Sequence, residues 1–169
     1  HGAAVEGHVG AGHNVAVHLQ RAAVGGQILA AIDLRLRGLH EAHAVELADL
    51  AGVELDPNAD LQHAVLDVAR RLVPSKVATA LVTLGGHGAV LVTADGAWAA
   101  TPPPIRVAST VGAGDSSLAG YLLADVAGEA PEGRLRRAVQ YGSAAASLAG
   151  TQAPTPDDLP SGEVPVTAL

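Results

Sequence analysis

The sequence contains no cysteine, no methionine and no phenylalanine, and aromatic residues make up only 2% of its 169 residues. Without cysteine the chain forms no disulfide and offers no thiolate to a metal ion. Without phenylalanine the core must be built from Ala, Val and Leu, whose small side chains bury less area each, so we expect modest stability per residue. Because methionine is absent even at position 1, we expect a fragment that begins inside a longer gene product or after processing.

The sequence also lacks an excess of basic residues and long hydrophobic runs. Its formal net charge is −7, which argues against a general nucleic-acid binder, because phosphate contacts need a basic face. No apolar run reaches the length of a membrane span, and no basic region followed by an apolar stretch indicates a secretory signal. We therefore expect a cytoplasmic protein without a membrane or nucleic-acid partner. A small phosphate-bearing ligand stays compatible, because backbone N–H groups bind anions without Lys or Arg.

The hydrophobic fraction of 49% is enough for a packed core, but the chain changes character near residue 44. Residues 1–43 hold six of the eight histidines and show no clear period. We interpret them as an irregular segment, either a remnant or an out-of-register translation, which reading the gene in other frames would test. The histidines have no third ligand at a defined spacing, so they predict no metal site. Residues 44–160 read as one α/β unit, and 161–169 as a tail.

Apolar periodicity and turn residues predict the elements of the α/β unit. Residues 61–72 repeat apolar side chains at helical spacing, and Pro74 ends that helix. The run 80–84, bounded by two glycines, is typical of a buried parallel strand. The other expected elements are helices at 44–51, 116–127 and 133–149, with Gly150 as the residue after the last helix, strands at 89–93, 97–100 and 105–108, and a surface segment from Thr151.

The segment Ser109-Thr110-Val111-Gly112-Ala113-Gly114-Asp115 is the candidate site for chemistry. We expect it to join a strand to a helix. Its glycines let the backbone turn sharply and approach a ligand closely. The N–H groups of Gly112, Ala113, Gly114 and Asp115 would then face outward at a helix start, where the helix dipole favours an anion. Such a site suits nucleotide phosphates and a phosphoryl group in transfer.

Asp115 adds a carboxylate beside this predicted anion site. A carboxylate there repels a bound phosphate unless it has a task, and a suitable task is accepting the proton of an attacking hydroxyl. The plainer alternative is that Asp115 caps a helix and that Gly112 and Gly114 only form a turn. For an isolated Gly-x-Gly-Asp segment, that alternative is favoured.

The wider pattern around Gly-Ala-Gly-Asp resembles the second signature of the PfkB carbohydrate kinase family, which has the ribokinase-like fold. Ser109 stands where many family members have Asp. Together with the preceding Pro102-Pro103-Pro104-Ile105-Arg106-Val107, it is similar to the 1-phosphofructokinase and tagatose-6-phosphate kinase branch. The resemblance implies a three-layer α/β fold, of which this chain holds the C-terminal, nucleotide-binding portion. The N-terminal portion and the β lid that bind the sugar are expected to be missing.

Three further segments carry the resemblance. In the family, a strand-end segment similar to Thr83-Leu84-Gly85-Gly86-His87-Gly88 lies against ATP, and ligands bind at strand carboxyl ends in open α/β sheets. Glu46 matches the Glu of an Asn-x-x-Glu segment that helps to organise magnesium and phosphate, but His43 stands at the Asn position. Glu46 is equally compatible with a structural role as a solvated carboxylate in the first turn of a helix. Residues 140–150 resemble the segment that closes over the adenine, with Ser143, Ala144 and Ser147 interpreted first as packing residues.

The resemblance implies an ATP- and magnesium-dependent enzyme that transfers the γ-phosphoryl group to a sugar-phosphate hydroxyl, converting fructose 1-phosphate to fructose 1,6-bisphosphate. Asp115 would be the base, Gly112, Ala113 and Gly114 would stabilise the transferring group, and Thr110 with residues 83–88 would border the nucleotide. A full-length parent could form a homodimer. The alternatives are an inactive nucleotide-binding remnant and a kinase of ribose, adenosine or another small alcohol.

Overall fold

The computed structural model of this chain describes residues 18–24, 27–33 and 61–169. Glu46, His43 and the helix expected at 44–51 lie outside the described residues. The same is true of the early histidines His1, His8, His13 and His40. These predictions therefore stay predictions, and the fold below concerns the described ranges.

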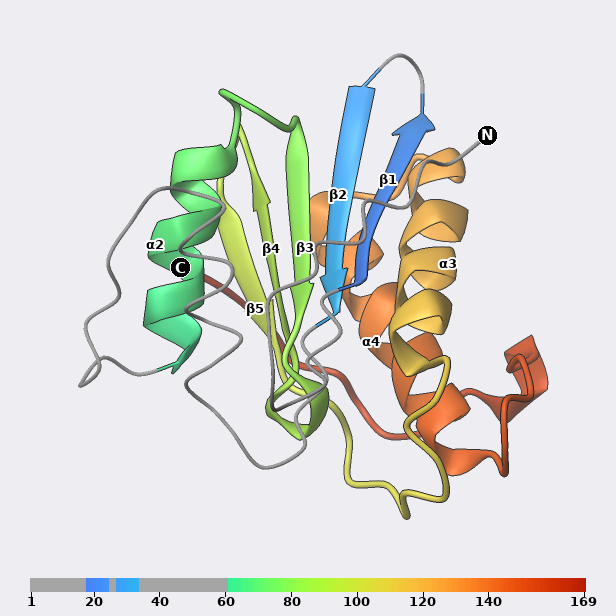
Figure 1. Cartoon of the computed structure of the whole chain (residues 1–169). Helices are drawn as coiled ribbons and strands as arrows, with labels where there is room; N and C mark the ends of the chain where they lie inside the picture. The colour runs from blue at the N-terminus through green and yellow to red at the C-terminus, as the bar shows by residue number, and fades with distance from the viewer. Residues whose placement is uncertain (1–17, 25–26, 34–60) are drawn as a thin grey trace, which may run out of the picture.

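The described strands form one six-stranded sheet with the order β1-β2-β3-β4-β5-β6 (Figure 1). β3 pairs in parallel with β2 and antiparallel with β4. The prediction of a parallel strand at 80–84 is therefore correct for the pairing with β2 but not for the pairing with β4. The other pairs are antiparallel. The strands span His18–Val24, Gln27–Asp33, Thr79–Thr83, Ala89–Thr93, Ala97–Ala100 and Val166–Ala168.

The sheet is the middle layer of three, because its strands β3, β4 and β5 are apolar and buried on both faces. Alternate residues of a strand point to opposite faces, and each face has its own core. One face packs against α2 (Leu61–Leu72) through Val65, Val68 and Leu72. The other face packs against α3 (Ala113–Val126) and α4 (Pro131–Ser147). Figure 1 shows α2 on one side of the sheet and α3 with α4 on the other. The predicted three-layer arrangement is therefore present in the described residues.

Small and aliphatic side chains do build most of the described core. The largest side chains below 2% exposure are all Leu or Val: Leu81, Leu84, Leu91, Leu135, Val65, Val68, Val82, Val90 and Val164. Glycines allow α3 and α4 to approach closely. A Cβ at Gly120 would lie 2.7 Å from the Arg137 carbonyl oxygen and 2.9 Å from Tyr141 Cβ.

Most predicted elements are confirmed, with shifted ends. The helix at 61–72 and the strands at 89–93 and 97–100 form as expected. α3 starts three residues before the expected Ser116, since Gly112 turns the chain directly into it. α4 begins at Pro131, whose missing N–H and fixed φ suit a first helical position. Gly150 has a positive φ of 70° but follows the end of α4 by three residues.

Three predictions about other parts of the chain are wrong. Residues 105–108 form no strand, and the segment instead crosses the end of α4 as an irregular connection. The tail is more than a surface segment, because β6 pairs with β5 and Val164 is buried at 1% exposure. Residues 18–24 and 27–33 form a hairpin next to β3, in a region that we expected to be irregular. Among the described helices, none has the length and apolar character to cross a bilayer.

Candidate phosphate-binding site

The predicted site segments meet at one end of the sheet. The short 3₁₀ helix η1 (Gly85–His87), the N-terminal end of α3 and the C-terminal end of α4 all lie at the lower end in Figure 1. β3 ends there, so this is the carboxyl end of a strand that runs parallel to its neighbour. Ligands bind at this edge in open α/β sheets.

Gly112 forms the turn that starts α3. It is the N-cap residue and has φ 80° and ψ −1°, in the left-handed region that glycine adopts at little cost. A Cβ at this position would meet nothing within 4 Å, so the requirement for glycine is conformational rather than steric. The first bond of the helix joins the Ser116 N–H to the Gly112 carbonyl oxygen at 2.9 Å. Earlier N–H groups of the first turn have no acceptor within the helix and carry its positive dipole end.

One detail of the expected anion site differs in the structure. We expected the N–H of Ala113 to face outward with its neighbours. It donates instead to the Thr110 carbonyl oxygen at 3.4 Å, which closes the turn just before the helix. The backbone donors best suited to a ligand are therefore those of Gly112 and Gly114, both of them partly exposed.

We expected a strand at 105–108 to lead into the turn. Instead, hydrogen bonds to α4 and a turn formed by Ser109 hold this part of the chain. The N–H groups of Ala108 and Ser109 both donate to the Ala146 carbonyl oxygen, at 2.8 and 3.2 Å. Ser109 Oγ accepts the Val111 N–H at 3.3 Å, a local bond between positions i and i+2 that serine shares with aspartate. Ser109 therefore orders the turn, a role that its sequence position alone did not reveal.

Asp115 lies in the first turn of α3 and is exposed. Its carboxylate shares the helix end with the N–H groups of Gly112 and Gly114, and solvent or a substrate can reach it. A carboxylate in a first turn is also favoured by the helix dipole alone. The structure thus brings together the two parts of the predicted constellation, an exposed carboxylate and a glycine-started helix.

The segment 83–88 forms a tight loop between β3 and β4. The Leu84 N–H donates to the Gly88 carbonyl oxygen at 2.7 Å, and Gly85 and Gly88 have positive φ values of 57° and 99°. Gly85, Gly86 and His87 are exposed, whereas Leu84 is buried in the core. The loop adjoins the start of the connection to α3, since a Cβ at Gly88 would lie 3.3 Å from Pro102 Cδ.

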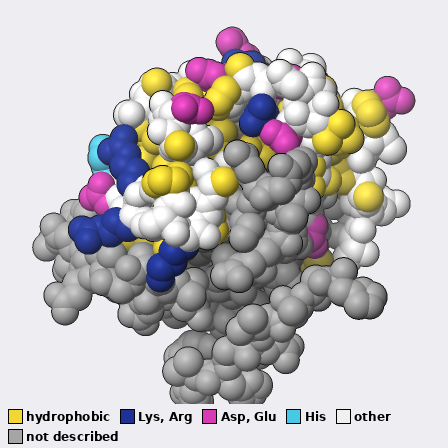
Figure 2. Space-filling model, turned by 90° about the horizontal axis from the view of Figure 1, so that it is seen from above, with side chains coloured by type: hydrophobic (Ala, Val, Ile, Leu, Met, Phe, Trp, Pro, Cys, Tyr) yellow, Lys and Arg dark blue, Asp and Glu magenta, His cyan; other side chains and the backbone are white. Residues whose placement is uncertain are grey.

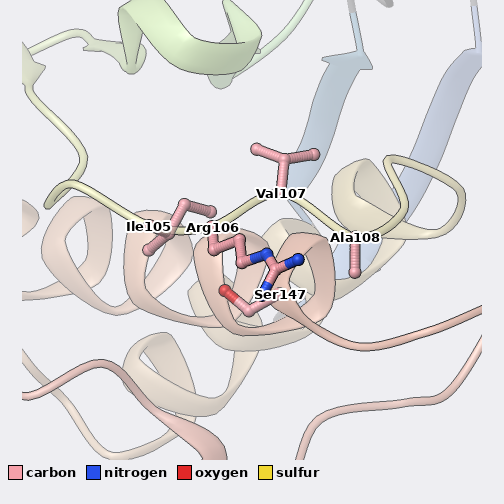
Figure 3. Close-up of a pocket in the computed structure, with 5 residues that line it drawn as sticks. All are labelled: Ile105, Arg106, Val107, Ala108 and Ser147. Atoms are coloured by element: carbon pink, nitrogen blue, oxygen red, sulfur yellow. The ribbon is translucent and has the colours of Figure 1, made fainter.

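A pocket of about 460 Å³ lies beside the turn, where the 105–108 segment meets the C-terminal end of α4. Figure 3 shows its lining residues, Ile105, Arg106, Val107, Ala108 and Ser147. The Arg106 side chain extends toward Ser147, and Val107, a residue with 60% relative exposure, points away from α4. Ser143 and Ala144 are buried as predicted for packing residues, but Ser147 is exposed and lines the pocket. The sequence analysis did not predict this pocket, and the only nearby feature that it noted was the run Pro102-Pro103-Pro104.

Metal ligation can be assessed only for the part of the chain that the structure describes. There, no three His, Asp or Glu side chains group as a metal site would require. Magnesium in phosphoryl-transfer sites usually takes one or two carboxylates and completes its octahedral shell with waters and phosphate oxygens. The exposed Asp115 is one carboxylate beside the candidate phosphate site, and the predicted contributor Glu46 lies outside the described residues.

Comparison with known proteins identifies the class of this chain. The model of the pfkB family carbohydrate kinase matches residues 41–158, which is more than half of the chain. The chain therefore belongs to the pfkB family of carbohydrate kinases, and its three layers are part of the ribokinase-like kinase fold. The family match covers both the 83–88 loop and the glycine turn.

Individual relatives are phosphofructokinases. The chain is 38% identical to 1-phosphofructokinase from Escherichia coli strain K12 over 102 residues, which cover 60% of this chain and 31% of that protein. It is 32% identical to 1-phosphofructokinase from Haloferax volcanii over 143 residues, 85% of this chain and 45% of the relative. This second match is too long to lie wholly within residues 44–169, so it includes part of the first 43.

A solved phosphofructokinase structure also resembles this chain. The crystal structure of phosphofructokinase-2 from Escherichia coli in complex with potassium matches with a TM-score of 0.60 and 34% identity, over 68% of this chain and 36% of that one. The chain thus spans less than half the length of each of these relatives.

Proposed function

We propose that this chain forms the nucleotide-phosphate-binding and catalytic part of an ATP-dependent kinase that phosphorylates fructose 1-phosphate to fructose 1,6-bisphosphate. The observation that carries the proposal is the left-handed Gly112 turn, which starts α3 beside the exposed Asp115. Family membership supports the sugar kinase class. The similarity to 1-phosphofructokinases and the Ser109 variant of the signature support the substrate.

The residues at the turn suit three tasks in phosphoryl transfer. The N–H groups of Gly112 and Gly114 would donate to the oxygens of the γ-phosphoryl group, whose negative charge the dipole of α3 also stabilises. Asp115 would accept the proton of the sugar hydroxyl while that oxygen bonds to phosphorus and the bond to the β-phosphate oxygen breaks. Ala113 would hold the turn closed through its bond to Thr110.

The neighbouring segments would hold the rest of the nucleotide. The exposed backbone of Gly85, Gly86 and His87 faces the same end of the sheet and would border it, with Thr83, Leu84 and Gly88 fixing the loop. The pocket beside α4 is large enough for a nucleobase and offers apolar and polar side chains from the 105–108 segment and Ser147. Bound ATP and magnesium would supply the phosphoryl group and neutralise part of its charge.

The test is the Asp115→Asn variant, assayed for ADP release with fructose 1-phosphate and titrated with ATP by calorimetry. If Asp115 is the base, turnover falls by about 10²–10⁴-fold, while the affinity for ATP stays within about threefold. The matched control is Asp95→Asn, which removes an exposed carboxylate in the β4–β5 turn at the opposite end of the strands. Asp95→Asn is expected to retain both properties.

Other outcomes would decide against parts of the proposal. Near-normal turnover in Asp115→Asn would refute the role of the base. ATP binding by the unaltered protein without turnover on fructose 1-phosphate, ribose or adenosine would indicate a non-catalytic nucleotide-binding remnant. Turnover on ribose or adenosine instead of fructose 1-phosphate would replace the substrate while keeping the site.

A further inference from the structure

We infer that one turn of α4, from Gly142 to Ala146, is a positioning element that fixes the glycine turn and Asp115 from both sides. This inference rests on the proposed function of the turn and concerns residues that touch no substrate. Gly142 and Ala146 are four residues apart, so they lie on the same face of α4. That face is turned toward the chain segments on either side of the Gly112 turn.

The segment before the turn is held by Ala146. Its carbonyl oxygen accepts the N–H groups of Ala108 and Ser109, at 2.8 and 3.2 Å. Carbonyl groups in the last turn of a helix lack an intrahelical donor, and α4 ends at Ser147. The connection therefore satisfies the helix end while the helix end fixes the connection, three residues before Gly112.

The segment after the turn is held by Gly142, where the two helices pack without space for a side chain. Gly142 is buried, and a Cβ there would overlap Ser117 Oγ and lie 3.3 Å from the Ala113 carbonyl oxygen. Ser117 is itself buried, at 6% exposure, and follows Asp115 by two residues. A side chain at position 142 would therefore push directly on the first turn of α3, which carries the proposed donors and base.

These two contacts make a specific claim about catalysis. The base and the phosphate donors sit on a turn whose own glycines make it pliable, and α4 supplies the rigidity. Misplacement of reacting groups by about 1 Å costs on the order of 10²-fold in rate, whereas binding of the nucleotide depends on a wider set of contacts. Disturbing the Gly142 contact should therefore reduce turnover far more than the affinity for ATP.

The experiment compares Gly142→Ala with Gly133→Ala in the full chain. Both replace a glycine of α4 by alanine, but a Cβ at Gly133 meets only the flexible side chain of Glu129, near the other end of the helix. We expect Gly142→Ala to lower turnover at least about tenfold, with ATP affinity within about threefold, and to shift the backbone amide NMR signals of Gly112, Gly114 and Asp115. Gly133→Ala should change none of these.

A second substitution distinguishes positioning from general damage. Ser117→Ala removes the atom that the new Cβ would overlap, so Gly142→Ala/Ser117→Ala should recover turnover and amide signals to within about threefold of the unaltered protein. Ser117→Cys, which enlarges the same buried atom by less than a methyl group, should cause a smaller loss in the same direction. It keeps the test available if Gly142→Ala does not fold.

Two results would overturn the inference. One is unchanged amide signals of the glycine turn in both Gly142→Ala and Ser117→Cys. The other is a loss of turnover in Gly142→Ala that Ser117→Ala does not restore. Because the amide signals need no activity, they test the positioning even if the unaltered protein proves unable to bind ATP, a result that would refute the proposed function alone.

Discussion

At the scale of single residues, glycines determine the shape of the candidate site for two different reasons. Gly112 has open space around it and is required for its positive φ alone. Gly142 is required for space, because Ser117 occupies the volume of its missing side chain. Gly88 is required for both reasons, since it has a φ of 99° and its missing Cβ would overlap the Ala100 carbonyl oxygen.

This difference gives a prediction for the 83–88 loop. Gly88→Ala combines left-handed strain with a backbone overlap and should lower the free energy of unfolding by roughly 3 kcal/mol, as measured by urea denaturation. Gly86→Ala in the same loop is the control, because a Cβ there meets nothing within 4 Å and its φ is not in the left-handed range. It should change stability by no more than about 0.5 kcal/mol. Equal effects of the two substitutions would contradict the prediction.

At the scale of elements, α3 and α4 are joined by polar contacts at the end away from the candidate site. Arg134 forms a 2.7 Å ion pair with Asp125, and burial raises the pKa of the Tyr121 hydroxyl above its usual value. Hydrogen bonds from Arg134 and Thr79 and the charge of Arg134 oppose that rise, while the charge of Asp125 adds to it. Figure 2, which looks onto this end, shows acidic, basic and apolar side chains interspersed on the described surface.

The raised pKa of Tyr121 predicts a loss of stability at alkaline pH. A phenol whose pKa is higher in the folded state than in the unfolded state contributes its full stability below the unfolded pKa of about 10. That contribution is lost as pH rises through the folded pKa. The fall in unfolding free energy between pH 9 and 11 should therefore be smaller in Tyr121→Phe than in the unaltered protein. An identical pH dependence in both proteins would refute the assignment.

The elements also show how far the sequence alone could reach. The helix at 61–72 was predictable because its apolar residues recur at helical spacing, and the strand at 89–93 because it is a short, continuous apolar run that is buried on both faces. The glycine turn was predictable because few residues adopt its backbone. The 105–108 segment was mistaken for a strand because its apolar residues line a pocket, and because the Ala108 N–H donates to α4 rather than to another strand. The Gly142 contact was not foreseeable, since it depends on the distance between two helices.

At the scale of the whole molecule, the C-terminal residues complete the sheet and one of its cores. β6 pairs with β5 at the edge of the sheet, and Val164 packs among residues of α3, α4 and the strands. The Thr101 N–H donates to the Pro165 carbonyl oxygen at 3.2 Å, which joins this segment to the connection that leads to the glycine turn. The tail is therefore part of the folded unit.

Val164→Ala should accordingly lower the free energy of unfolding by about 2 kcal/mol, because it leaves a cavity between the sheet and the helices. The exposed neighbour Glu163 provides the control, and Glu163→Ala should stay within about 0.5 kcal/mol of the unaltered protein. Chemical denaturation followed by circular dichroism measures both. A Val164→Ala variant as stable as the control would show that the tail is dispensable for the core.

Because aromatic residues are scarce, the protein has a simple intrinsic tryptophan fluorescence. Trp98 is the only tryptophan in the sequence, lies on β5 at 9% exposure, and donates from Nε1 to Glu132 Oε1 at 2.9 Å, near the start of α4. Its fluorescence therefore comes from a single buried indole at the seam between the sheet and α4. Excitation of that one residue reports whether the helix is docked, and no label has to be introduced near the glycine turn.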